Sequence, residues 1–122
     1  MESLYARLGG EAAILAAVDV FYAKVLADDL TRPFFEGLDM DAQTKKQIAF
    51  MARAFGGPAE YHGRDLRSSH AALVRDKGLT DVHFDRIAVH LETTLREMRV
   101  PESLIAEVLG LIGGTRDEVL DR

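Results

Sequence analysis

The chain has 122 residues, which is the size of one ordinary domain, and we expect residues 1–122 to form a single domain. It contains no cysteine, which excludes disulfides, thiolate nucleophiles and cysteine-ligated metal clusters. Twenty acidic residues against fifteen Lys and Arg give a net charge of −5, the opposite of what nucleic-acid binding requires. No signal sequence or apolar run of membrane-spanning length is present, so we expect a globular domain in the cytoplasm.

The first half of the chain shows apolar residues at helical spacing between paired glycines and prolines. We expect a short helical turn over the first eight residues and a helix over 11–27 that stops at Asp28. A connector carrying Phe34 and Phe35 follows. Asp39 is suited to cap a helix over about 40–55, which the Gly56-Gly57-Pro58 sequence ends.

The second half of the chain follows the same pattern. The spacing predicts a helix over 65–76, a long helix capped by Thr80, and a last helix with Pro101 in its first turn. No segment alternates with a period of two over the length of a strand. We therefore predict an all-α domain of five or six helices.

The predicted helix over 40–55 carries polar residues beside its apolar stripe. Gln43, Gln47 and Phe50 share one helical row, with Lys46 next to them. The two amides could lie at the edge of a solvated face. Alternatively, they could line a pocket, where a buried amide needs a hydrogen-bond partner.

Two further polar residues stand within apolar rows. His70 follows the stripe of Leu66, Leu73 and Val74, which suits either a core histidine or a metal ligand. Tyr22 lies among apolar neighbours, and its hydroxyl needs a partner, which could be a backbone carbonyl. Six of the nine aromatic residues fall between positions 21 and 55, a clustering that a large flat ligand would explain.

Taken together, these features make the sequence resemble the group I truncated haemoglobins over nearly its whole length. The most specific features are Gly9-Gly10, Phe34-Phe35, the Ala54–Pro58 run and His70, in this order. The matching stretches are 4–10, 18–22, 25–29, 34–35, 39–40, 46–47, 54–58, 61–64, 70, 78–79, 83–84 and 100–101. The resemblance implies a truncated globin fold, in which helices form a two-over-two sandwich around one haem.

The resemblance also implies roles for individual residues. It places the proximal iron ligand at His70 and a phenylalanine packed on the porphyrin at Phe35. Tyr22 and Gln47 correspond to a polar distal pair, with Gln43 and Lys46 on the same helix. Further haem contacts map to Phe34, Phe50, Tyr61, Leu66, Ser69, Leu73, Leu79, Phe84 and Ile87, with His83 near a propionate.

Two departures from relatives shape the expected haem chemistry. No histidine follows His90, so the covalent bond that some relatives make to a haem vinyl is not expected, and we predict non-covalent haem b (iron protoporphyrin IX). Lys46 stands where some relatives have a distal histidine. Its ammonium could reach solvent or a propionate. Alternatively its amine binds the iron, as a lysine does in some relatives, although losing the proton at pH 7 costs a free lysine about 4.6 kcal/mol.

We therefore expect a haem protein that binds oxygen, with nitric oxide and carbon monoxide as other ligands. One alternative is an enzyme that oxidises nitric oxide to nitrate and depends on a separate reductase. A remote alternative, which ignores the resemblance, is a cofactor-free helical interaction module. We expect no nucleic-acid or membrane partner, and nothing in the sequence requires more than a monomer.

Overall fold

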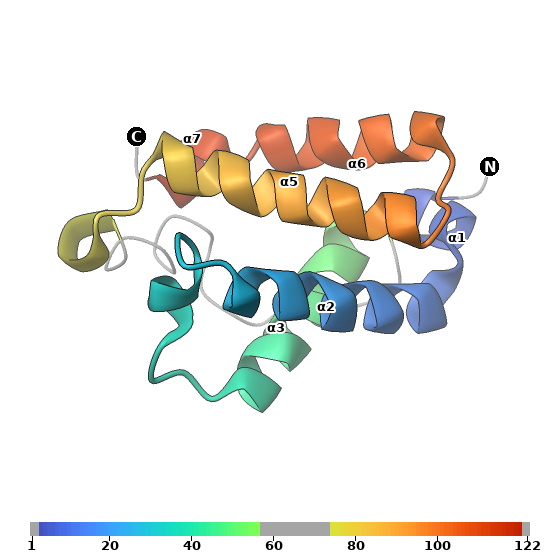
Figure 1. Ribbon diagram of the computed structural model, residues 1–122. Helices are drawn as coiled ribbons and strands as arrows, with labels where there is room; N and C mark the ends of the chain where they lie inside the picture. Colours follow the sequence, from blue (N-terminus) through green and yellow to red (C-terminus); the bar gives the residue numbers. More distant parts are fainter. Residues whose placement is uncertain (1–2, 57–73, 121–122) are drawn as a thin grey trace.

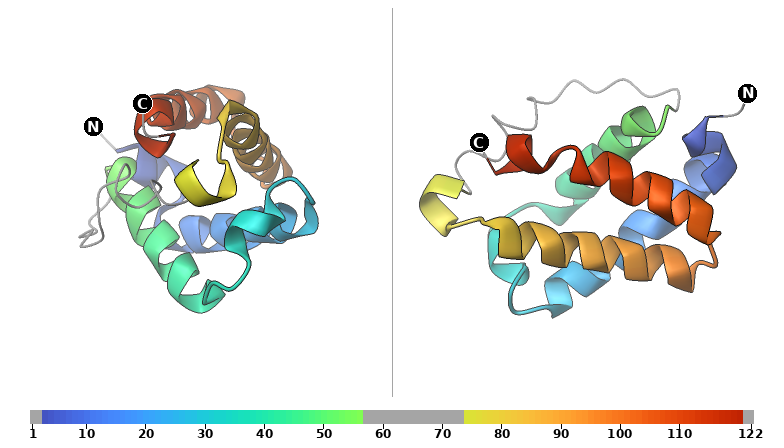
Figure 2. Two further views of the ribbon diagram at one scale, coloured as in Figure 1. Left: turned by 90° about the vertical axis from the view of Figure 1, so that its left-hand side faces the viewer. Right: turned by 90° about the horizontal axis from the view of Figure 1, so that it is seen from above.

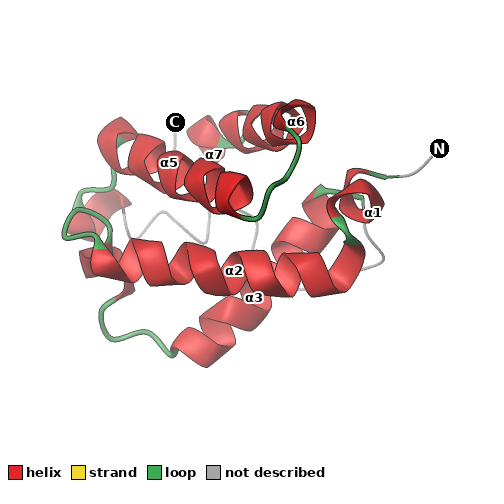
Figure 3. Cartoon of the chain, turned by 45° about the vertical axis from the view of Figure 1, so that its right-hand side comes forward, coloured by secondary structure: helices red, strands yellow, loops and turns green. Residues whose placement is uncertain are grey.

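The computed structural model describes residues 3–56 and 74–120, apart from the side chains of Phe50, Arg53, Ala54 and Glu118. In these two ranges every regular element is helical (Figure 3), which confirms the all-α prediction. The elements are α1 (Leu4–Leu8), α2 (Gly10–Ala27), the 3-10 helix η1 (Arg32–Phe35), α3 (Met40–Ala54), a helical turn over 74–77, α5 (Asp81–Glu97), α6 (Glu102–Gly113) and α7 (Arg116–Val119).

Four long helices form the body of the molecule. α2 packs against both α3 and α5, and α5 packs against α6. In Figure 1, α5 and α6 lie above α2 and α3, and the end-on view in Figure 2 shows the four helices around a common interior. Val18, Val25, Ile105 and Val108 are almost completely buried there. This arrangement is the predicted two-over-two sandwich.

The ends of the helices follow the capping signals in the sequence. Asp39 accepts hydrogen bonds from the backbone N–H groups of Asp41 and Ala42 through Oδ1, as predicted for an N-cap. Gly9 separates α1 from α2 with φ 116°, and a Cβ there would lie 2.9 Å from the Cβ of Ala13. The chain can therefore turn sharply at this point only because position 9 is glycine.

Some predicted boundaries differ from the structure. The Phe34-Phe35 connector is a 3-10 helix, and Pro101 is the N-cap of α6 rather than part of its first turn. The sequence did not predict α7, because a helix of four residues is too short to show periodicity. Of the helix predicted over 65–76, only residues 74–76 are described. Within the described ranges, no helix is long and apolar enough to cross a membrane.

Candidate functional site

Tyr22 is the most deeply buried polar aromatic residue of the described chain, with only 6% of its surface exposed. Its ring lies 5.4 Å from that of Phe21 on the same helix and 5.7 Å, edge to face, from that of Phe35 on η1. Burial raises the pKa of the Tyr22 phenol, although a hydrogen bond from Gln43 acts in the opposite direction. The hydroxyl is therefore protonated at neutral pH and can act as a donor.

Gln43 is the polar partner of Tyr22 in this structure. Its Nε2 donates to the Tyr22 hydroxyl oxygen at 3.4 Å, from the first turn of α3 to the middle of α2. Because Gln43 occupies a lone pair of that oxygen, the hydroxyl proton is left free to point elsewhere. The resemblance implies Tyr22 and Gln47 as the two distal residues, with Gln43 on the same helix. Gln47 lies one turn further along α3 and is also half-buried, whereas Lys46 is exposed.

An apolar wall stands beside this polar pair. Phe34, Leu79 and Phe84 are buried together with Leu120, and the half-buried Phe35 packs against both this cluster and the main core. Of the other predicted contacts, Ile87 is half-buried on α5. Residues from η1, the segment before α5, and the C-terminal end thus converge, although they are far apart in the sequence.

His83 closes one end of the wall. Its ring stacks edge to face on Phe34 at 4.7 Å, and its Nδ1 accepts the backbone N–H of Thr80 at 3.0 Å. An Nδ1 that accepts a hydrogen bond carries no proton, so the neutral ring must be protonated on Nε2. Nε2 of His83 can therefore donate a hydrogen bond to an anion, while Nδ1 is bound to Thr80.

The site also contains residues that the sequence analysis missed. The guanidinium of Arg116 lies 4.5 Å from the centre of the Phe84 ring and pairs with Asp81 at 3.0 Å and Asp85 at 2.6 Å. Through these contacts, and through the packing of Leu120, the segment that follows α6 lies against the apolar wall. The only available signal was the apolar pair Val119-Leu120, which is too short to predict an element.

Several predicted site residues lie outside the described part of the chain. They are Tyr61, Leu66, Ser69, His70 and Leu73, together with the side chain of Phe50. The assignment of His70 as the iron ligand consequently remains a prediction. Among the described residues, no three His, Asp or Glu side chains gather into a group that could hold a metal ion.

The fold and the site together define a small globin. The sequence matches the family of bacterial-like globins over residues 3–121. The group 1 truncated hemoglobin GlbN of Synechocystis sp. is 49% identical over 113 residues, which cover 93% of this chain and 91% of that protein. The group 1 truncated hemoglobin LI410 of Chlamydomonas moewusii is 47% identical over 119 residues, covering 98% and 68%.

Solved structures give the same result. The 2/2 hemoglobin of Synechococcus sp. PCC 7002, in the cyanomet state and with covalently attached heme, is 48% identical and covers 99% of this chain and 100% of its own, with a TM-score of 0.96. The ferric truncated hemoglobin of Tetrahymena pyriformis is 40% identical, covers 98% of each chain and has a TM-score of 0.90. The chain belongs to the group 1 truncated haemoglobins, a family of haem globins. The family resemblance and the fold predicted from the sequence are thereby confirmed.

Proposed function

We propose that this chain is a single globin domain that holds haem b non-covalently and binds oxygen, with nitric oxide and carbon monoxide as further ligands. The observation that carries the proposal is the buried, protonated Tyr22 hydroxyl, which Gln43 supports from α3. A buried donor of this kind, beside an apolar aromatic wall, suits a small electron-rich ligand.

The described residues fit a haem. Phe35, Ile48, Val74 and Ile87 are apolar but only half-buried, although each packs against a core cluster. They offer apolar surface that a large flat ligand would cover, and covering it would stabilise the folded chain. We assign the axial ligand to His70, and the edge of His83 is available to a propionate. Haem, when bound, supplies an iron with a position open to a diatomic ligand.

The role of the distal residues follows from their protonation and burial. Tyr22 donates its hydroxyl proton to a ligand in the pocket, and Gln43 holds the phenol oxygen in place. A hydrogen bond to an acceptor that carries negative charge contributes about 1.5–3 kcal/mol, and the low dielectric of a buried site favours the upper part of that range. We assign the role of second donor to Gln47, which is half-buried one turn along the helix that carries Gln43.

A visible absorption spectrum tests the haem assignment directly. The protein produced with an adequate haem supply should absorb strongly near 400 nm, and His70→Ala should lose stable haem. His90→Gln changes a histidine outside the proposed haem contacts and is the matched control. Wild-type haem retention by His70→Ala would overturn the assignment of the ligand. No absorption in the wild type after haem addition would instead favour a cofactor-free helical module.

The non-covalent attachment of haem rests on the absence of histidine after His90. The Synechococcus relative is described with covalently attached heme, so this chain would differ from it. Acidified organic solvent should extract all haem from this protein, and the polypeptide should keep the mass of the bare chain. A haem adduct in the mass spectrum would contradict the proposal.

Lys46 defines a second candidate arrangement, in which its amine occupies the sixth iron position. It is exposed on α3 and lies three residues after Gln43, so the two side chains are neighbours on the surface of the helix. Spectra of the ferric protein between pH 6 and 10 separate the two arrangements. A low-spin form that disappears in Lys46→Ala supports ligation by lysine, whereas a high-spin form throughout supports an open site.

A further inference from the structure

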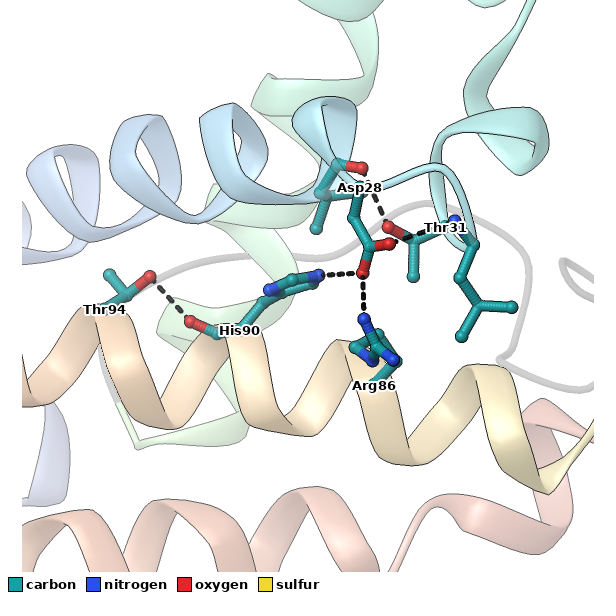
Figure 4. Close-up of polar contacts among 7 residues, drawn as sticks. Asp28, Thr31, Arg86, His90 and Thr94 are labelled. Carbon is teal, nitrogen blue, oxygen red and sulfur yellow. Dashed lines mark hydrogen bonds and ion pairs between the residues drawn. The ribbon is translucent and has the colours of Figure 1, made fainter.

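A polar cluster joins the end of α2 to the middle of α5 (Figure 4). We call Asp28, Arg86 and His90 the corner cluster. Oδ2 of Asp28 accepts hydrogen bonds from Nε2 of His90 at 2.8 Å and from the Arg86 guanidinium at 3.0 Å. The two donors lie four residues apart on α5 and therefore on one face of that helix. Both donate to the same carboxylate oxygen, so the cluster ties the end of α2 to α5 in addition to ending the helix.

Asp28 also organises the turn that leads out of α2. Its Oδ1 accepts the backbone N–H of Leu30 at 3.0 Å, and its carbonyl accepts those of Thr31 at 3.1 Å and Arg32 at 2.8 Å. The Leu30 N–H, followed by His90 and Arg86, holds the pKa of the Asp28 carboxyl below its usual value. The carboxylate is therefore ionised at neutral pH, and the hydrogen bonds from Leu30, Arg86 and His90 go to a charged acceptor.

The turn sets the position of the aromatic residues on η1. This helix begins at Arg32, and its last residue, Phe35, packs edge to face on the Tyr22 ring at 5.7 Å. Tyr22 itself lies on α2, six residues before Asp28. A shift of the corner therefore moves Phe35 relative to Tyr22, since only the turn at 28–31 connects the two elements along the chain.

We infer that Asp28, Arg86 and His90 are positioning residues for the distal pocket: they fix η1 against α2, so that Phe35 holds the Tyr22 ring and its hydroxyl points at the ligand. This inference rests on the proposed role of Tyr22 as the donor. Their hydrogen bonds join the turn to α5, so they would act on the ligand through Phe35. Loosening the corner widens the range of Tyr22 orientations and shortens the residence of the ligand.

The test compares variants of the corner cluster in the haem-loaded protein. His90→Leu removes one donor to Asp28, and His90→Gln keeps a donor on a side chain of similar reach. Glu97→Gln is the matched control, because the Lys24–Glu97 ion pair of 2.9 Å also joins α2 to α5 but does not contact the cluster. Arg86→Gln serves if His90→Leu fails to fold, because Arg86 is half-exposed and its loss leaves the core intact.

Three measurements are made on each variant: the oxygen dissociation rate by stopped flow, the C–O stretching band of the carbon monoxide complex, and exchange of the Leu30 amide in that complex. His90→Leu should speed oxygen dissociation by about 2- to 30-fold, the range typical of remote packed residues, and should broaden or shift the C–O band. His90→Gln should restore most of the wild-type behaviour, and Glu97→Gln should match the wild type. The amide of Leu30 should exchange faster only where the cluster is broken.

Two outcomes overturn the inference. The first is a faster Leu30 amide exchange in His90→Leu with unchanged oxygen dissociation and C–O band, since a loosened corner would then have no effect on the pocket. The second is an equal change in Glu97→Gln, which would indicate a general loss of α2–α5 packing. Tyr22→Phe separates this failure from that of the proposed function: if Tyr22→Phe also leaves oxygen dissociation unchanged, the donor assignment itself is wrong.

Discussion

Replacing Tyr22 by phenylalanine removes one hydroxyl and leaves the aromatic packing in place. The ring contacts with Phe21 and Phe35 persist in the variant, since they do not involve the hydroxyl. The bond lost inside the protein is the one from Gln43, and at 3.4 Å it is long and weak. We expect the stability of the folded chain to change by less than about 1 kcal/mol.

The effect on ligand binding should be much larger. If Tyr22 is the donor that we propose, its loss should remove a hydrogen bond to a negatively charged acceptor, which contributes about 1.5–3 kcal/mol. At constant association rate this corresponds to oxygen dissociation about 10- to 150-fold faster. Carbon monoxide is a nearly neutral acceptor, for which a net hydrogen bond of about 0.5–1.5 kcal/mol predicts only about a 2- to 12-fold change.

Stopped-flow measurement of oxygen and carbon monoxide dissociation checks this prediction. Tyr5→Phe is the matched control, because Tyr5 is a half-buried tyrosine on α1 and should leave both rates unchanged. A thermal melt of each variant separates a loss of folding from a loss of the donor. Oxygen dissociation within a factor of about two of the wild type, in a folded Tyr22→Phe protein, would refute the donor role.

Three further predictions concern stability. Thr31 is completely buried and donates from Oγ1 to the carbonyl of Val25 at 2.8 Å, so Thr31→Val should cost about 1–3 kcal/mol in a denaturant titration, whereas Thr31→Ser should keep the bond. Arg99 has φ 61°, which is strained for a residue with a Cβ, so Arg99→Gly should raise the free energy of unfolding by about 1 kcal/mol in the same titration. Because the folded-state pKa of Asp28 is lowered, its contribution is complete above the unfolded value of 3.8 and is lost as the pH falls through the folded value. The stability difference between the wild type and Asp28→Asn should therefore narrow on acidification from about pH 5 to 3, and a constant difference would show that Asp28 has the same pKa in both states.

Much of the fold could be read from the sequence because its signals are local. Apolar spacing predicted α2, α3, α5 and α6, and the caps at Asp39 and Thr80 lie where the capping residues indicated. Glycine at position 9 marked a turn that no residue with a Cβ could make. These features depend on a few neighbouring residues, so they can be recognised without knowing what packs against them.

The polar contacts depended on tertiary structure. The spacing showed that the Tyr22 hydroxyl needs a partner and offered a backbone carbonyl, but the observed hydrogen bond comes from Gln43, 21 residues away. Asp28 read only as a helix stop, yet it gathers Arg86 and His90 from 58 and 62 residues away. The length and missing cysteines bounded the class of protein from the start. Which polar side chains meet was decided by the crossing of α2 with α3 and α5, because hydrogen bonds are short and a helical pattern does not specify its partner.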